Sequence, residues 1–397
     1  MIVRYANHLS EQGHDVTLIL EEVWIADVLS TKIRSEVTVT SSKNAMAEKN
    51  VTYDIAIGTY WKTYTTLFQI RATAYCQFIQ SLECRFFDSS DPRSVNLARI
   101  VQELDVPAIV VADWIADSLT HSSRRSRVAT VLNGIDKNVY PISVPREVNP
   151  GQRLKVVIEG SESGFKGFLE SAKGVAGVSI PIDLSIFSVT GSFPAEALTA
   201  LQSNPQINLK IHGAVSQEEF YRHLCEADIL VKSSRVEGMP GPPLEAFHAG
   251  CTGIYTDVTG IESYAEHGVN AIIVPFDSMR SITNWIETLD SNRNLLQQLQ
   301  NNAISTAEKW KTAESSSKDF ENELMQCYED YVANFSSEHI NQHVLPTLFD
   351  AITHERHDNS YGVDELNQLR MNQINDIYYL DSNVAKRYSE HLENELT

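Results

Sequence analysis

A regular alternation of short apolar strands with amphipathic helices runs through the chain twice and constrains the fold more than any other feature. In the first half, the predicted strands are residues 16–20, 54–58, 73–79, 108–111 and 128–131. The predicted helices of this half are residues 2–9, 95–104 and 113–119. In the second half, the predicted strands are residues 155–158, 183–188, 207–212, 229–232, 252–256 and 271–274. Strands that alternate with helices predict parallel sheets covered by helices on both faces, which is an α/β fold.

The length of the chain and one proline-rich stretch predict how it divides into domains. A chain of 397 residues exceeds what a single core usually serves. Residues 141–150 hold three prolines, a composition typical of a linker. We predict an N-terminal Rossmann-like domain at 1–145, a second one at 151–335 that ends in long helices at 279–290 and 293–333, and a helical extension at 336–397. The cleft between two such domains is the usual place for a ligand.

The N-terminus lacks a feature that a doubly wound domain normally has. The chain begins on a predicted helix that ends near Gly13. Such a domain usually begins with a strand and a tight, glycine-rich turn into its first helix. We therefore expect the first strand and its turn to be missing. A domain that simply starts with a helix is the alternative.

Composition excludes several classes of partner and site. The formal net charge of -20 argues against a nucleic-acid partner, because phosphate neutralisation needs clustered Lys and Arg. The one basic cluster (Arg124, Arg125, Arg127) is expected to be a solvated surface, which leaves peripheral membrane association open. No apolar run is long enough to span a membrane. The five cysteines are scattered without CxxC spacing, so we expect reduced thiols, no metal site and a cytoplasmic location.

The densest group of candidate functional residues lies between Glu237 and Glu245. Two glycines and three prolines separate these carboxylates, and they cannot continue a helix. Pro242 and Pro243 mark a helix start, so Glu237 is predicted at the end of a strand and Glu245 in the first turn of the next helix. Both would face the crevice beyond the carboxyl ends of the strands, and the start of the helix would offer N–H groups to a phosphate.

These residues resemble a known family. The segment from Glu237 to Glu245 resembles the E-x7-E signature of retaining GT-B glycosyltransferases of family 4. Ser234 before it, Gly250 and Gly260–Glu262 after it, and the turn at Lys166 follow that family's order. The stretch FIQSLE at 78–83 and the VIEG at 157–160 resemble the branch related to bacterial rhamnosyltransferases. The resemblance covers most of residues 50–290 and implies two Rossmann-like lobes with a cleft between them.

The resemblance implies a role for each matching residue. Glu237 is the catalytic candidate, lending negative charge beside the anomeric carbon as the glycosidic bond breaks. Glu245 would accept hydrogen bonds from the nucleotide ribose, and Lys166 would hold the diphosphate. The remaining residues expected at the donor are Gly160, Ser161, Ser234, Gly238, Met239, Pro240, Gly241 and Leu244. Residues expected at the cleft are Gln80, Glu83, Asn133 and Gly134.

Two positions depart from the family pattern. Ser161 stands where the family commonly has an arginine, so one cation is missing. Pro240 stands where a glycine is usual, and proline has no N–H to offer the donor.

The predicted function is therefore a retaining hexosyltransferase. It would move a hexose or deoxyhexose from a nucleotide-diphosphate sugar to a glycan or lipid-linked acceptor in surface polysaccharide biosynthesis, with no cofactor and no catalytic metal. The main alternative, which Ser161, Pro240 and the expected loss of the first strand favour, is a catalytically weak sugar-nucleotide-binding or scaffolding subunit. An epimerase acting on a sugar nucleotide is a third alternative. It would need an acid–base pair that the sequence does not reveal.

Overall fold

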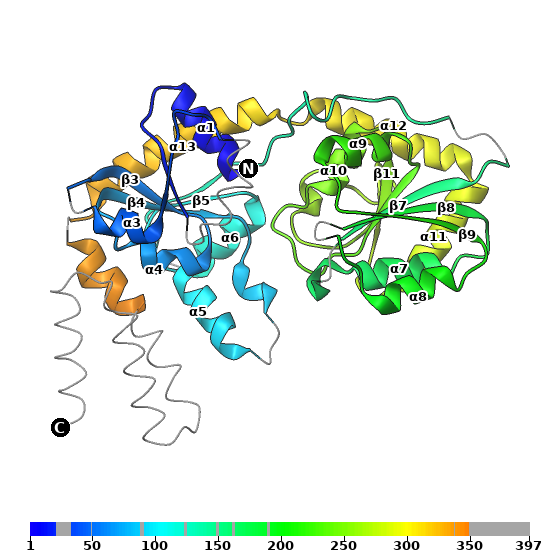
Figure 1. The fold of residues 1–397 in the computed structure, drawn as a ribbon, viewed down its shortest axis with the longest axis horizontal. Helices are drawn as coiled ribbons and strands as arrows, with labels where there is room; N and C mark the ends of the chain where they lie inside the picture. Colours follow the sequence, from blue (N-terminus) through cyan, green and yellow to red (C-terminus); the bar gives the residue numbers. More distant parts are fainter. Residues whose placement is uncertain are drawn as a thin grey trace, which may run out of the picture. The chain divides into compact units, whose positions relative to one another are not determined.

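The chain forms two α/β units in a computed structural model, shown in Figure 1. The structure describes residues 1–20, 33–48, 50–87, 91–122, 125–147, 151–160, 163–188, 191–336 and 338–348. One unit comprises Met1–Val111, Ile115–Val131 and the chain from Ser317 on. The other comprises Ala112–Trp114 and Leu132–Ser316.

The first unit has a four-stranded parallel sheet with the strands in chain order. These strands are β3 (Tyr53–Gly58), β4 (Ala72–Ile79), β5 (Ala108–Val110) and β6 (Val128–Thr130). A second parallel pair, β1 (Thr17–Leu20) and β2 (Thr38–Ser41), lies outside that sheet. The helices of this unit include α1 (Ile2–Glu11), α3 (Ser42–Ala47), α4 (Tyr64–Leu67), α5 (Pro92–Gln102), most of α6 (Asp113–Ser122) and α13 (Ala313–Asn334) from Ser317 on, with the short η1 (Trp61–Thr63) and η2 (Glu83–Phe86).

The second unit has a six-stranded parallel sheet in the order β12-β11-β10-β7-β8-β9. Its strands are β7 (Leu154–Gly160), β8 (Ile182–Ser188), β9 (Ile207–Gly213), β10 (Ile229–Lys232), β11 (Thr252–Thr256) and β12 (Ile272–Val274). The order runs outward in both directions from the adjacent strands β7 and β10. This is the doubly wound arrangement that the alternating sequence pattern predicted.

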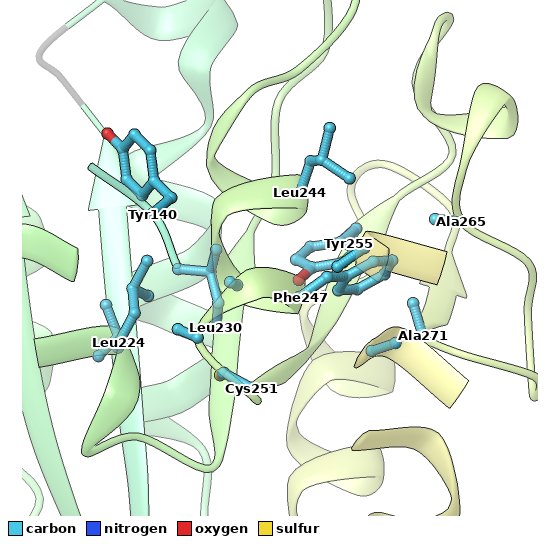
Figure 2. Packing of buried hydrophobic residues seen from close by; sticks show 14 of the residues in the cluster. Tyr140, Leu224, Leu230, Leu244, Phe247, Cys251, Tyr255, Ala265 and Ala271 are labelled. Atoms are coloured by element: carbon cyan, nitrogen blue, oxygen red, sulfur yellow. The ribbon is translucent and has the colours of Figure 1, made fainter. Parts of the chain in front are cut away.

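Helices cover both faces of this sheet, as Figure 1 shows. One core packs Val157 and Leu230 against α9 (Gln217–Cys225), α10 (Pro242–His248) and α12 (Arg293–Lys309). Figure 2 shows Leu244 and Phe247 of α10 within it. The other core packs Val156 and Val231 against α7 (Phe168–Ala176), α8 (Ala195–Gln202) and α11 (Met279–Ser291). Consecutive strand residues thus fill opposite cores, which is why these strands read as continuous apolar runs.

The long helix predicted at 293–333 is two helices, because a β-bridge interrupts it. α12 ends at Lys309, and α13 (Ala313–Asn334) begins after Thr312 pairs with Ile135. The Ile135 N–H donates to Lys311 O at 3.1 Å, and the Ala313 N–H donates to Ile135 O at 2.8 Å. These partners lie far apart in the sequence, so the local hydrophobic spacing could not predict the break between α12 and α13.

The units divide the chain differently from the domains predicted at 1–145 and 151–335. Leu132–Ser316 is one unit because Ile135 and Tyr140, which precede the predicted linker, are buried in its core. From Ser317 on, α13 belongs to the other unit, where Tyr331 joins the core. Of the extension predicted at 336–397, the described part includes η5 (Ile340–Val344), and residues 349–397 lie outside the described residues.

Candidate active site

The candidate active site lies at the carboxyl ends of β7 and β10, the two central strands of the second unit. Ile158 of β7 pairs with Val231 of β10. The next residues along these strands, Glu159 and Lys232, therefore come to the same edge of the sheet. In doubly wound sheets, ligands bind where the strand order reverses, outside the carboxyl ends of such strands.

The Lys166 turn is fixed to the segment that follows β10. It comprises η3 (Gly164–Lys166) and Gly167, which adopts a left-handed conformation with φ 65°. A Cβ atom at Gly167 would lie 1.6 Å from Ser233 O, so only glycine permits this approach. The Arg235 N–H also donates to Phe165 O at 2.8 Å. Two independent contacts thus hold the predicted phosphate-binding turn beside the strand end.

This packing brings together three of the predicted site residues. The Lys166 ammonium lies 3.0 Å from Glu237 Oε1 and 2.9 Å from Oε2. The Ser234 hydroxyl donates to Glu237 Oε1 at 2.8 Å. The Glu237 residue is only 9% exposed, whereas the Lys166 side chain is 31% exposed. A nearly buried carboxylate is therefore held by one partly solvated cation and one hydroxyl.

Lys232 and Glu159 complete an ionic network that the sequence-based site did not include. The Lys232 ammonium lies 2.6 Å from Glu159 Oε2 and 3.9 Å from Glu237 Oε1, and the residue is 4% exposed. Burial opposes the charge of this lysine, but the carboxylates of Glu159 and Glu237 outweigh it and raise the pKa of Lys232. The sequence did contain one signal for this network: Lys232 ends an otherwise apolar strand. A lysine buried at such a position needs an acidic partner.

The turn from Gly238 to Gly241 follows Glu237, and two of its carbonyl groups accept hydrogen bonds from side chains of other segments. Trp114 Nε1 donates to Gly238 O at 2.7 Å, and the Tyr264 hydroxyl donates to Pro240 O at 2.5 Å. Within the described part of the chain, the N–H groups of Gly238, Met239 and Gly241 donate to no partner. Backbone amides left free in this way make a local concentration of positive charge.

These amides replace the helix start that the sequence predicted as the source of N–H donors. α10 begins at Pro242, and neither Pro242 nor Pro243 has an N–H. The next amide, of Leu244, already donates to Gly241 O at 2.9 Å. The N–H groups without a partner therefore lie in the preceding turn, not in the first turn of α10. Pro240, the departure from the family pattern, offers its carbonyl to Tyr264 instead.

Glu245 lies in a different environment from Glu237. It is half-buried on α10. Burial and the negative charge of Glu159 raise the pKa of Glu245 to about 7, although Tyr140 and Lys232 oppose the shift.

The structure spreads the other predicted residues more widely. Gly160 ends β7, where a Cβ atom would lie 2.9 Å from the Phe168 ring, and Leu244 is a core residue at 1% exposure. Asn133 O accepts a hydrogen bond from Trp310 Nε1 at 2.9 Å, and Gly134 packs against Thr312 O. Both thus lie beside the break that precedes α13. Ser161 lies outside the described residues.

Gln80 and Glu83 belong to the first unit. Gln80 Nε2 donates to Thr59 O at 3.2 Å. The Glu83 carboxylate accepts the Trp61 N–H at 2.8 Å, and burial raises the pKa of Glu83 to about 7. Their predicted place at a cleft stays a prediction, and what the structure shows is their bonds to backbone groups of their own unit.

The predicted basic surface cluster is wrong in part. Arg125 is turned inward, where its guanidinium donates to Gln77 Oε1 and Gln102 O. Arg127 pairs with Glu323 at 2.5 Å and with Asp330 at 3.2 Å. Arg124 lies outside the described residues. The described members of this cluster therefore offer no solvated patch for an anionic surface.

The described residues contain no group of three or more His, Cys, Asp or Glu side chains arranged to hold a metal ion. His248 of α10 is fully buried, and its Nδ1 lies 2.9 Å from Tyr140 O. Burial lowers the pKa of His248 to about 4, which fits a packed histidine rather than an acid–base group.

No described helix combines the length and apolar character that crossing a membrane requires.

A family comparison identifies part of the second unit. Residues 193–306 match the family model described as Glycosyl transferases group 1. The match includes the strand β10, the turn after Glu237 and the helix α10. No curated protein sequence matches the chain.

The fold as a whole is shared with solved glycosyltransferases. HepE of Anabaena, in a complex with UDP and glucose, is 15% identical with a TM-score of 0.65, and the match covers 82% of this chain and 95% of that one. Sucrose-phosphate synthase of Thermosynechococcus elongatus is 13% identical, with a TM-score of 0.65 and coverage of 83% and 92%. A glycosyltransferase of Rickettsia africae is 12% identical, with a TM-score of 0.60 and coverage of 84% and 94%.

The fold is thus a GT-B fold with Rossmann-like units, as the sequence predicted. The matched segment and the shared fold support a glycosyltransferase.

Proposed function

We propose that the chain moves a hexose or deoxyhexose from a nucleotide-diphosphate sugar to a glycan or lipid-linked acceptor, with retention of the anomeric configuration. The observation that carries this proposal is the pairing of Glu237 with Lys166 at one edge of the sheet, directly before a turn in which the amides of Gly238, Met239 and Gly241 have no hydrogen-bond partner among the described residues. A carboxylate suits a developing positive charge on the sugar, and the ammonium with the amides suits the diphosphate.

The proposed reaction needs no metal ion. The bond between the anomeric carbon and the phosphate oxygen breaks, and its electron pair leaves with the nucleoside diphosphate. The acceptor hydroxyl then attacks the same face of the sugar, and its proton passes to the departing diphosphate. Glu237 would stabilise the oxocarbenium-like state, and Lys166 with the amides of Gly238, Met239 and Gly241 would stabilise the leaving group. Glu245 would accept a hydrogen bond from the ribose.

A role in surface polysaccharide biosynthesis is part of the proposal. It is supported by a further similar structure, the lipopolysaccharide outer core galactosyltransferase WaaB, at 14% identity and a TM-score of 0.58. We place the chain in the cytoplasm, where sugar nucleotides are made, and leave the branch related to rhamnosyltransferases as a proposal.

One observation favours the alternative of a weakly active sugar-nucleotide-binding subunit. The same ammonium that would bind the diphosphate is already paired with both oxygens of Glu237. Donor and Glu237 therefore compete for Lys166, and a site in which Glu237 keeps this lysine would bind nucleotide weakly and turn over slowly.

The test combines binding and turnover on the purified chain. Calorimetry with UDP, GDP and dTDP reports binding, and release of nucleoside diphosphate from UDP-, GDP- and dTDP-sugars reports hydrolysis or transfer. The proposed enzyme binds at least one nucleotide and turns over a matching sugar donor. Binding without turnover would favour the binding subunit. If the chain binds no nucleotide and turns over no donor, both proposals fail.

A further inference from the structure

Lys232 is a buried cation to which the proposed reaction assigns no task. Its side chain is 5% exposed at the end of β10, and its ammonium lies between two carboxylates from different elements. One contact, to Glu159 Oε2, is a hydrogen bond of 2.6 Å, whereas the distance to Glu237 Oε1 is 3.9 Å. An ammonium has three donor hydrogens, so the bond to Glu159 leaves donors for a second carboxylate.

Lys166 differs from Lys232 in exposure and in the partner it holds. Its side chain is 31% exposed, and its ammonium contacts both oxygens of Glu237. If a diphosphate takes this ammonium, Glu237 loses its nearest cation, although its side chain is only 11% exposed. A carboxylate that is buried and unpaired is strongly unfavourable. Only the Ser234 hydroxyl would then remain on Glu237, so a second cation that can replace Lys166 favours the proposed donor binding.

We propose that Lys232 is a positioning residue that takes over Glu237 when Lys166 moves to the donor diphosphate. This inference rests on the proposed function and adds the residue that resolves the competition for Lys166. Glu159 anchors the Lys232 ammonium, and a shift of about 1 Å brings it from 3.9 Å into hydrogen-bond reach of Glu237 Oε1. Glu237 then keeps its charge and orientation while the mobile lysine serves the phosphate.

The charged groups near Lys232 are consistent with this task. Glu159 comes from β7, Glu237 from the segment after β10, Glu245 from α10 and Lys166 from η3. The charges of Glu159, Glu237 and Glu245 all act to raise the pKa of Lys232 against the effect of burial. Burial, together with the negative charges of Glu237, Glu245 and Glu262, raises the pKa of Tyr264. Lys232 is thus a buried cation that is hydrogen-bonded to Glu159 and lies 3.9 Å from Glu237 Oε1.

The test measures epistasis between Lys232 and Glu237 in nucleotide binding. Calorimetry with UDP, GDP and dTDP first identifies which nucleotide the wild-type chain binds. In Lys232→Met, the affinity for that nucleotide is expected to fall by about tenfold or more, because Lys166 can no longer leave Glu237. In a Glu237→Gln background Lys166 has no carboxylate at position 237 to leave, so adding Lys232→Met is expected to change the affinity by less than about twofold.

Two further variants separate this role from folding. Lys232→Met leaves Glu159 without its ammonium, so Lys232→Met with Glu159→Gln removes both charges of that pair. The double variant is expected to melt closer to wild type yet bind the nucleotide as weakly as Lys232→Met. Lys210→Gln, on exposed β9, is the matched loss of a lysine and is expected to leave the affinity within about twofold.

The outcomes distinguish this inference from the proposed function. An equal loss of affinity in the wild-type and Glu237→Gln backgrounds would show a purely structural role and overturn the inference. Unchanged affinity in Lys232→Met would overturn it as well, while leaving the proposed function intact. If the wild-type chain binds none of the three nucleotides, the proposed function fails first.

Discussion

At the residue scale, the two signature carboxylates meet environments that assign them different tasks. Glu237 is held by Lys166 at 2.9 Å and by the Ser234 hydroxyl at 2.8 Å. Glu245 is half-buried on α10, and burial raises its pKa to about 7. A carboxylate next to a cation is suited to stabilise positive charge, whereas one that is half-protonated near neutral pH is suited to hydrogen bonding.

The titration of Glu245 predicts how stability depends on pH. Its pKa in the folded chain lies above the ordinary value of 4.5, so the folded state binds this proton more tightly than the unfolded state. The stabilisation is fully present below about pH 4.5 and is lost as the pH rises through 7. In Glu245→Gln this contribution is absent, so the free energy of unfolding should decline less between pH 5 and pH 8 than in wild type.

Urea unfolding at several pH values measures this difference. Glu83 shifts in the same direction and is present in both proteins, so the comparison isolates Glu245. Parallel pH profiles for the two proteins would show that Glu245 does not titrate in the folded chain near neutral pH.

At the element scale, the Lys166 turn depends on the conformation of one glycine. A Cβ atom at Gly167 would collide with Ser233 O, and φ 65° is unfavourable for alanine. Gly167→Ala should therefore lower the free energy of unfolding by at least about 1–2 kcal/mol and weaken nucleotide binding, because the turn moves away from the end of β10. Denaturant unfolding and calorimetry measure the two effects.

Gly164 provides the matched control. It lies in the same turn, but a Cβ atom there would meet nothing within 4 Å. Gly164→Ala should change the free energy of unfolding by less than about 0.5 kcal/mol. Equal effects from both substitutions would mean that the close approach to Ser233 does not hold this turn.

Elements with a strong local signal could be predicted from the sequence, and those fixed by distant partners could not. β8 (Ile182–Ser188), in which apolar residues alternate with polar ones at its start, and β10, which is fully buried, match the predicted ranges within one residue. The break between α12 and α13 depends on Ile135, which lies more than 170 residues earlier. Lys232 became a candidate only when β7 and β10 were seen to be neighbours, because its acidic partner lies on the other strand.

At the scale of the whole molecule, the chain leaves its first unit and returns to it. α13 follows the second unit in sequence, but from Ser317 on it belongs to the first. Phe320 is 3% exposed, stacks on Tyr5 with ring centroids 4.2 Å apart and meets Phe78 edge-on. A division of the chain by sequence order alone misses this return, because hydrophobic spacing within a helix does not say which core the helix joins.

This arrangement predicts a separation of effects. Phe320→Ala should destabilise the first unit by roughly 3–5 kcal/mol, as expected when a buried aromatic side chain is lost. The nucleotide affinity, which depends on residues of the second unit, should change by less than about twofold. Stepwise denaturant unfolding together with calorimetry tests this. A loss of nucleotide affinity that matches the loss of stability would contradict the separation.

The most direct test compares sugar transfer by the wild-type chain and by Glu237→Gln under saturating donor. We expect wild type to transfer sugar from one of the UDP-, GDP- or dTDP-sugars. We expect Glu237→Gln to be slower by about 100-fold or more while binding the free nucleotide at least as tightly, since Lys166 is released for the diphosphate. A Glu237→Gln protein that transfers sugar at the wild-type rate would contradict the role given to this carboxylate.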